Sequence, residues 1–161
     1  MKKAYFAAGC FWCAVPAFRD LDGVISTVSG YSGGTEPSPA YEDVKAQRTG
    51  HRETVEVCYD ERAISFERLL DAFFSAVDPF DGGGQFIDRG FSYTLAVYCN
   101  GEEEKRAVRA KIEEIQRESG RPVFVAVEDF TGFWRAEEYH QDYDLKNPDA
   151  FAEELKSSGR K

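Results

Sequence analysis

The apolar positions of this chain follow two spacings, one typical of strands and the other of helices. The run from Ala4 to Ala8 is apolar on both faces and predicts a central strand of a sheet. Apolar residues alternate with polar ones through Val55, Val57 and Tyr59, which predicts another strand with one buried face. Three further strands are expected at residues 24–31, 93–99 and 123–127.

Three helices are expected between these strands and after them. An apolar stripe from Phe66 to Val77 recurs at helical intervals and predicts a helix that contributes to the core. Residues 102–119 form a charged amphipathic helix whose buried side includes Val108 and Ile112. A short helix is expected after Pro148. These segments alternate with strands, as in a mixed domain.

The first helix should begin near Phe11, and two long loops should follow it. Pro16 lacks a backbone N–H, so we expect a kink or a late start of this helix. Residues 32–48 and 78–90 are rich in residues that favour turns and are predicted to be long loops, which are usually functional in a compact domain. The triple glycine at 82–84 lacks the Lys and Ser or Thr of a phosphate-binding loop.

The order of the elements indicates a single α+β domain, residues 1–161, without repeats or a linker. We expect a two-layer sandwich in which helices pack on a mainly antiparallel sheet. Cys10 follows the first strand, whereas Glu53 and Tyr93 stand at the starts of two others. If those strands run antiparallel to the first, the three residues meet at one edge of the sheet.

Composition narrows the classes of partner. The formal net charge of −9 argues against nucleic acid or an anionic membrane as the main partner, because both require clustered Lys and Arg. No apolar run approaches the length of a membrane span, and a cytoplasmic protein is expected. His51 and His140 are isolated in the sequence, so a metal site is not expected. No bound cofactor is expected either, and the default oligomeric state is a monomer.

The segment Gly9-Cys10-Phe11-Trp12-Cys13 carries the strongest chemical signal. Cys10 should lie where a strand gives way to a helix, among unpaired N–H groups at the positive end of the helix dipole. Both features favour the reactive thiolate, so Cys10 is a candidate nucleophile. Cys58 and Cys99 lie on strand-like runs and are expected to pack as small buried residues.

This segment resembles the active-site signature of the peptide methionine sulfoxide reductase A family, and further matches follow in the family's order. They are Gly30-Tyr31-Ser32-Gly33-Gly34, Pro39-Ala40-Tyr41, Thr49-Gly50-His51-Arg52-Glu53, Gln85-Phe86-Ile87-Asp88-Arg89-Gly90 with Tyr93, and Glu138-Tyr139-His140-Gln141-Asp142-Tyr143. The resemblance covers about residues 3–148 and leaves 149–161 as a C-terminal tail. It implies a ferredoxin-like sandwich and the thiol-dependent reduction of methionine S-sulfoxide, free or in proteins, to methionine.

The resemblance also implies roles for the polar candidates. Cys10 would attack the sulfoxide sulfur, and Glu53 would protonate the leaving oxygen, which requires a carboxyl pKa raised by burial. Tyr41 and Tyr93 would donate hydrogen bonds to that oxygen. Asp88 would organise the oxygen-binding network.

Three further residues are candidates for substrate binding. Phe11 and Trp12 would form the apolar walls around the substrate methyl group, with plain core packing as the alternative for each ring. His140 would line the cleft, and a structural hydrogen-bonding role is the alternative.

Attack would leave Cys10 as a sulfenic acid that must be reduced. Many family members use cysteines in a C-terminal tail, whereas this chain has none after Cys99. Residues three apart in a first helical turn share a face, so a Cys10–Cys13 disulfide reduced by thioredoxin or glutaredoxin is the expected route. Direct reduction of Cys10 by an external thiol and a resolving role for Cys58 are the alternatives.

Two other classes of function fit parts of the sequence. Cys-x-x-Cys is typical of thioredoxin-like disulfide oxidoreductases. That hypothesis leaves Tyr41, Glu53, Asp88 and Tyr93 without a role, and the motif comes too early in the chain. A peptide-binding module with exposed aromatic residues is the second rival, and it predicts that Cys10→Ser retains function.

Overall fold

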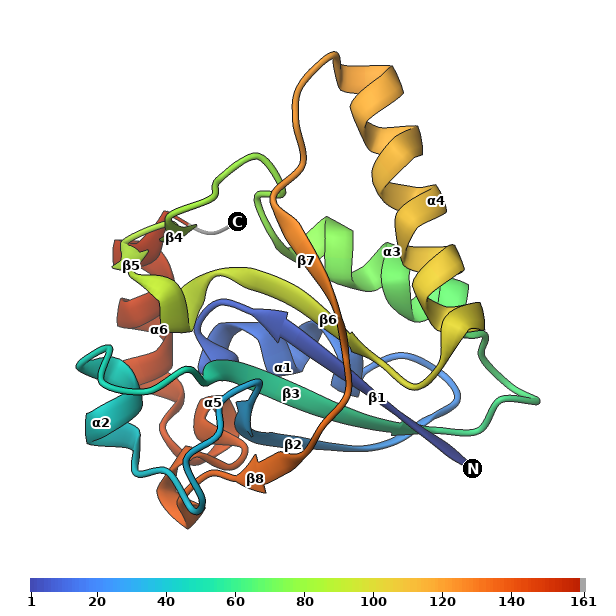
Figure 1. The fold of residues 1–161 in the computed structure, drawn as a ribbon. Helices are drawn as coiled ribbons and strands as arrows, with labels where there is room; N and C mark the ends of the chain where they lie inside the picture. Colours follow the sequence, from blue (N-terminus) through green and yellow to red (C-terminus); the bar gives the residue numbers. More distant parts are fainter. Residues whose placement is uncertain (160–161) are drawn as a thin grey trace.

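The computed structural model describes residues 1–159 and contains a six-stranded sheet with helices packed on it (Figure 1). The strands of this sheet are β1 (Lys2–Ala8), β2 (Val24–Ser32), β3 (Arg52–Tyr59), β6 (Leu95–Cys99), β7 (Val125–Asp129) and β8 (Phe133–Arg135). A separate two-stranded hairpin is formed by β4 (Gly84–Gln85) and β5 (Asp88–Arg89). The helices are α1 (Phe11–Arg19), α2 (Tyr41–Lys45), α3 (Phe66–Ala76), α4 (Glu102–Ser119), α5 (Tyr143–Lys146) and α6 (Pro148–Ser158), with 3₁₀ turns η1 (Phe91–Tyr93) and η2 (Glu138–His140).

The sheet order is β7-β6-β1-β3-β2-β8, which places β1 at the centre between β6 and β3. β1 pairs antiparallel with both neighbours, and Phe6 lies opposite Val55 and Val97. The pair β6 and β7 is parallel, with α4 as the crossover between them. The expected α+β architecture with a mainly antiparallel, mixed sheet is therefore confirmed.

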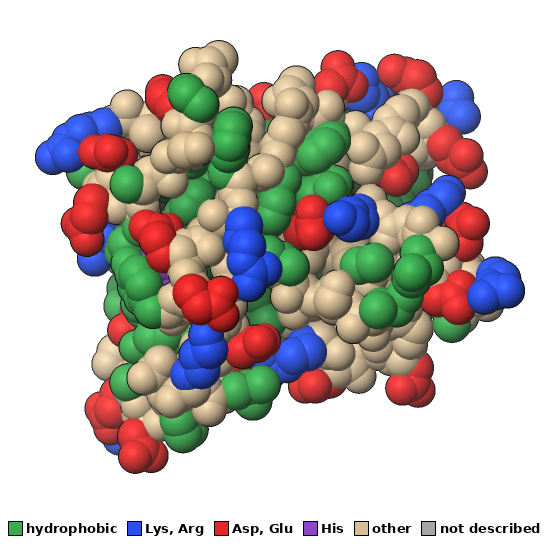
Figure 2. All heavy atoms as spheres, turned by 90° about the horizontal axis from the view of Figure 1, so that it is seen from below, with side chains coloured by type: hydrophobic (Ala, Val, Ile, Leu, Met, Phe, Trp, Pro, Cys, Tyr) green, Lys and Arg blue, Asp and Glu red, His purple; other side chains and the backbone are tan. Residues whose placement is uncertain are grey.

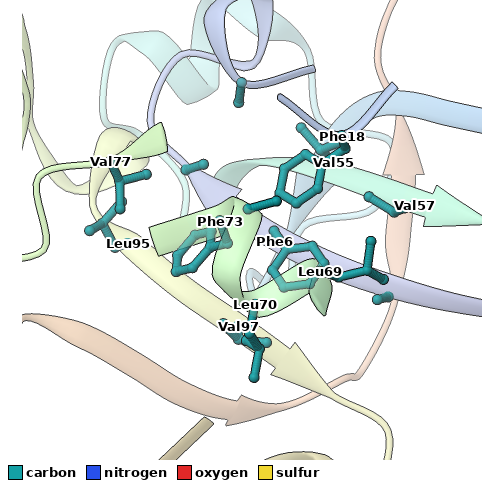
Figure 3. Close-up of a cluster of buried hydrophobic side chains, with 14 of the residues drawn as sticks. Phe6, Phe18, Val55, Val57, Leu69, Leu70, Phe73, Val77, Leu95 and Val97 are labelled. Atoms are coloured by element: carbon teal, nitrogen blue, oxygen red, sulfur yellow. The ribbon is translucent and has the colours of Figure 1, made fainter. Parts of the chain in front are cut away.

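The main core lies between the sheet and helices α1, α3 and α4. Figure 3 shows the part of it that the sheet forms with α1 and α3. Phe6 of β1 is fully buried and stacks on Phe18 of α1 at 4.9 Å between ring centroids. Phe73 of α3 lies 5.5 Å from the Phe6 ring. Truncating such a phenylalanine to alanine costs about 3–5 kcal/mol, so this contact fixes α1 on the sheet.

The opposite face of the sheet is covered by a loop rather than by helices. Tyr5 and Tyr98 lie on this face, and Phe130 stacks on the Tyr5 ring at 4.1 Å. Phe133 packs against the same small cluster. The sheet is thus sealed on both sides, with its larger core toward the helices.

Several elements differ from the predicted ones. α1 begins at Phe11 and continues through Pro16, so the expected late start is wrong. Tyr93 ends the turn η1 instead of starting β6. The predicted loop at 32–48 contains α2, and β8 was not anticipated. Each missed element is short and forms where tertiary contacts outweigh local pattern.

Charged side chains are distributed over the surface. On the face in Figure 2, lysine and arginine lie interspersed with aspartate and glutamate and do not merge into a continuous basic surface. Within residues 1–159 no helix combines the length and apolarity needed to cross a bilayer.

Candidate active site

Cys10 lies at the junction between β1 and α1. β1 ends at Ala8, Gly9 turns the chain with a φ of 83°, and Cys10 occupies the N-cap position of α1. The Cys10 carbonyl accepts hydrogen bonds from the backbone N–H groups of Cys13 and Ala14, both at 3.1 Å. The side chain is only 7% exposed, so the predicted strand-to-helix position is confirmed for a buried thiol.

Glu53 lies beside this helix start. It is the second residue of β3, 1% exposed, and its Oε1 accepts a hydrogen bond from the Phe11 backbone N–H at 3.1 Å. Burial raises the pKa of Glu53 to about 8, although the Phe11 N–H opposes this rise. The carboxyl is therefore mostly protonated at neutral pH and has a proton to donate.

The surroundings of the Cys10 thiol act against ionisation, whereas the helix start had suggested a thiolate. A hydrogen bond with the Cys13 side chain, burial and the nearby Glu53 carboxyl raise the pKa of Cys10 well above its ordinary value. The first N–H of the helix, that of Phe11, is bound by Glu53 and not by the Cys10 sulfur. The raised pKa values of Cys10 and Glu53 both favour the neutral form of each group before a substrate arrives.

Tyr41, Asp88 and Tyr93 complete the polar side of the site. The side chains of Tyr41 and Tyr93 are hydrogen-bonded to each other, and burial followed by the Glu53 charge raises the pKa of both phenols. The Asp88 carboxylate acts on the pKa of Cys10, Glu53 and Tyr93. Residues from α1, α2, β3, β5 and η1 therefore converge on one buried cluster of hydrogen-bonding groups.

The apolar side is an aromatic cluster around α1. The Trp12 ring stacks on Tyr143 at 3.9 Å with an interplanar angle of 8°. Its Nε1–H donates a hydrogen bond to Nδ1 of His140 at 2.9 Å. The Phe11 ring lies 5.1 Å from His140 and 6.4 Å from Tyr41. The two predicted wall residues are thus held in a fixed aromatic frame.

His140 holds this frame together from the C-terminal segment. It is 1% exposed, and burial lowers its pKa, so the imidazole is neutral. Because Nδ1 accepts from Trp12, the ring proton resides on Nε2. Nε2 is buried and has no hydrogen-bond partner within residues 1–159. His140 therefore supports Trp12 and keeps one donor free inside the protein.

Sequence reasoning missed Glu137, which connects β2 and α2 next to the site by hydrogen bonds to Tyr31 and Tyr41. Its Oε1 accepts a hydrogen bond from the Tyr31 hydroxyl at 2.8 Å, and its Oε2 accepts one from the Tyr41 backbone N–H at 3.0 Å. Gln141 fixes the same segment by bonding both the N–H and the carbonyl of Ser29 on β2. The motif at 138–143 pointed to this segment, but no local pattern distinguished Glu137 from its neighbours.

His51, by contrast, has a structural role. It is 1% exposed, its Nδ1 accepts from the Gly34 N–H at 3.2 Å, and its Nε2 bonds the Glu36 carbonyl at 2.8 Å. A Cβ at Gly34 would lie 2.6 Å from the imidazole ring, so glycine is required there. Within the described part of the chain, no three or more His, Cys, Asp or Glu side chains cluster as metal ligands would.

Comparison with known proteins agrees with this geometry. The family model described as peptide methionine sulfoxide reductase matches residues 2–161. "Peptide methionine sulfoxide reductase MsrA 2" of Staphylococcus aureus strain Mu50 is 41% identical over 165 residues, which cover 100% of this chain and 93% of the relative. The protein of the same name from Rhizobium meliloti is 46% identical over 149 residues, which cover 91% of this chain and 73% of the relative.

Solved structures show the same fold. Reduced Mxr1 from Saccharomyces cerevisiae has a TM-score of 0.86 at 29% identity and covers 92% of this chain and 86% of its own. Methionine sulfoxide reductase A of Corynebacterium diphtheriae has a TM-score of 0.83 at 30% identity and covers 91% of this chain and 75% of its own. The chain therefore belongs to the peptide methionine sulfoxide reductase family.

Proposed function

We propose that this protein reduces methionine S-sulfoxide, free or within proteins, to methionine by using Cys10 as the nucleophile. The observation that carries the proposal is the shared burial of a thiol and a protonated carboxyl, Cys10 and Glu53, at one helix start. Tyr41 and Tyr93 add phenol donors to the same cluster. A nucleophile and an acid are the two groups that thiol-dependent removal of oxygen from sulfur requires.

The reductive step begins when the Cys10 sulfur attacks the sulfoxide sulfur. Glu53 donates its proton to the sulfoxide oxygen and recovers one from the Cys10 thiol. The oxygen then moves to the Cys10 sulfur, which becomes a sulfenic acid, while the S–O bond of the substrate and the new bond between the two sulfurs both break and methionine leaves. Cys10 is oxidised by two electrons and the substrate is reduced by two. The site keeps its net charge, which suits groups buried away from water.

The aromatic frame selects the substrate. Phe11 and Trp12 would contact the methyl group, while Tyr41 and Tyr93 would hold the oxygen, with Asp88 ordering these donors. Fixing a methyl group on one side and an oxygen on another permits only one configuration at the pyramidal sulfur. The preference for the S epimer follows the family resemblance.

Cys13 is the resolving cysteine in this proposal. Its thiol is hydrogen-bonded to Cys10 at the start of α1, so it attacks the Cys10 sulfenic acid to form a disulfide and release water. Cys58 is poorly placed, because it lies on β3 five residues beyond Glu53. That separation is roughly 17 Å along a strand, whereas a disulfide needs Cα atoms within about 7 Å.

A dithiol protein such as thioredoxin or glutaredoxin would then reduce the disulfide. Cys13 is only partly buried and lines a groove of about 690 Å³ between α1, α3 and α6, the side from which an attacking thiolate would approach. Mxr1, the yeast relative, has been solved in complex with Trx2. The alternative is direct reduction of the Cys10 sulfenic acid by a small thiol. The monomeric state and cytoplasmic location stay predictions.

Mass spectrometry after one equivalent of methionine sulfoxide tests the proposal. The wild type should form one equivalent of methionine and lose the mass of two hydrogen atoms as a Cys10–Cys13 disulfide forms. Cys13→Ser should form the same methionine and stop at a sulfenic acid on Cys10, whereas Cys58→Ser, a matched control, should behave as the wild type. A disulfide in Cys13→Ser would refute the resolving role. Methionine formation by Cys10→Ser would refute the nucleophile.

A further inference from the structure

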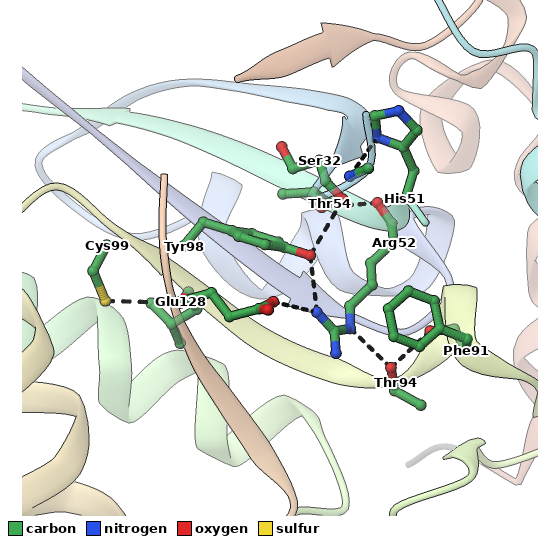
Figure 4. Close-up of polar contacts among 11 residues, drawn as sticks. Ser32, His51, Arg52, Thr54, Phe91, Thr94, Tyr98, Cys99 and Glu128 are labelled. Carbon is green, nitrogen blue, oxygen red and sulfur yellow. Dashed lines mark hydrogen bonds and ion pairs between the residues drawn. The ribbon is translucent and has the colours of Figure 1, made fainter. Parts of the chain in front are cut away.

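Arg52 directly precedes Glu53 on β3. Because successive side chains of a strand point to opposite faces, the Arg52 and Glu53 side chains lie on opposite faces of the sheet. Arg52 is 8% exposed and bonds three residues at once (Figure 4). Its Nε donates to the Thr94 hydroxyl at 2.8 Å, and its Nη1 donates to the Tyr98 hydroxyl at 3.0 Å and to Glu128 Oε2 at 2.6 Å. One guanidinium therefore links β3, β6 and β7.

These bonds bridge a gap in the sheet. β1 separates β3 from β6, but it ends at Ala8, which pairs with Leu95. Beyond Ala8 the chain leaves the sheet at Gly9 to form Cys10, so no central strand joins Arg52 to Thr94 by backbone hydrogen bonds. The Arg52 side chain makes the connection instead, on the far side of the sheet from Cys10.

Arg52 also holds both ends of the turn that carries Tyr93. The guanidinium lies over the Phe91 ring at 4.3 Å, while its Nε bonds Thr94. The Thr94 hydroxyl in turn donates to the Phe91 carbonyl at 2.6 Å. Tyr93 lies in the chain between these two contacts. Glu53 is the next residue after Arg52 on β3, so the Arg52 contacts also fix the backbone that carries Glu53.

We propose that Arg52 is a positioning residue that sets the separation between Glu53 and Tyr93, the acid and a phenol donor of the proposed reaction. The inference rests on the proposed function of those two residues. Arg52 acts through the backbone of β3 and η1. Only a planar guanidinium can donate to Thr94 and to Glu128 at the same time, so lysine does not replace arginine here. Small misplacement of catalytic groups is costly, about 10²-fold for 1 Å.

Single-turnover kinetics test this inference. Arg52→Lys keeps a cation for Glu128 but loses the fork, and it should slow methionine formation at least tenfold. Reduction of the Cys10–Cys13 disulfide by dithiothreitol should stay within twofold of the wild type, since it needs neither donor. Lys105→Met is the matched control, because Lys105 bonds Asp129 on β7 at 2.5 Å. This control should leave both rates within twofold.

A pH profile and a smaller change separate positioning from loss of stability. Thr94→Val removes one acceptor of Arg52 and the donor to the Phe91 carbonyl, and it should slow methionine formation about threefold or more while urea unfolding shows the protein still fully folded under the assay conditions. Both variants should also shift the alkaline limb of the rate profile, because moving Glu53 changes its distance from the Phe11 N–H and from Asp88, which both act on its pKa. Wild-type rates and pH limbs in Arg52→Lys and Thr94→Val would overturn the inference. If Glu53→Gln keeps wild-type rates, the proposed function fails instead.

Discussion

The burial of Glu53 predicts a specific dependence of stability on pH. Its carboxyl is 1% exposed, and burial raises its pKa from an ordinary value of 4.5 to about 8. Between these two values the folded protein binds a proton that the unfolded chain has released. Stability must therefore fall as pH rises through this window and level off above about 8.

The size of this effect follows from the two pKa values. Each pKa unit corresponds to about 1.4 kcal/mol, so ionising Glu53 in the folded protein costs roughly 5 kcal/mol. Glu53→Gln has the same shape and no proton to lose, and it should abolish this part of the pH dependence. Cys10 affects stability only above its ordinary value of 9, and His140 acts below its ordinary 6.5, with the opposite sign.

Urea unfolding at several pH values between 5 and 9 measures the difference. The free energy of unfolding of the wild type, minus that of Glu53→Gln, should fall by several kcal/mol from pH 5 to pH 8. Every other titrating group is common to both proteins and cancels in this difference, apart from groups that interact with Glu53. If the unfolding free energies of the two proteins change in parallel with pH, Glu53 is ionised throughout this range. That result would refute its role as a proton donor.

Three further predictions concern other contacts. Tyr93→Phe removes a buried donor, and the single-turnover rate should fall on the order of 10²-fold while disulfide reduction is unchanged; equal slowing of both steps would contradict this role. Trp12→Phe breaks the bond to His140 and should raise KM for the sulfoxide several-fold while costing about 1–2 kcal/mol of unfolding free energy; an unchanged KM would exclude Trp12 from the substrate pocket. Gly33→Ala forces a side chain onto φ 98°, with its Cβ 2.3 Å from the Tyr98 hydroxyl, and urea unfolding should show a loss of about 2 kcal/mol or more.

The sequence predicted the large elements of the fold because their patterns are long. The alternation through Val55 and Val57 marked β3, and the stripe from Phe66 onward marked α3. Short elements escaped because their cause is not local. β8 forms through pairing with β2, where Tyr31 lies opposite Trp134. Such a pairing depends on residues about a hundred positions apart, and a window of a few residues does not contain it.

Part of the candidate site could be predicted from the order of the strands, but the residues that depend on distant contacts could not. Cys10 and Glu53 could be expected at one edge of the sheet, since antiparallel neighbours return there. Glu137 and Arg52 could not, because each acts through partners in distant segments. Nothing in the sequence around either residue names those partners, whereas the structure places each beside a backbone that carries a candidate catalytic side chain.

The protonation of Cys10 shows how two local rules compete at one helix start. A helix N-terminus favours an anion, and the sequence suggested that this anion would be the Cys10 thiolate. In the structure the Phe11 N–H is bound by Glu53, so the favourable position belongs to the carboxylate. In the proposed reaction, the same N–H would stabilise the charge on Glu53 between the loss of its proton to the substrate and the arrival of the thiol proton. The helix start therefore serves the acid of the proposed reaction directly and the nucleophile only through it, which is why the resting thiol need not be ionised.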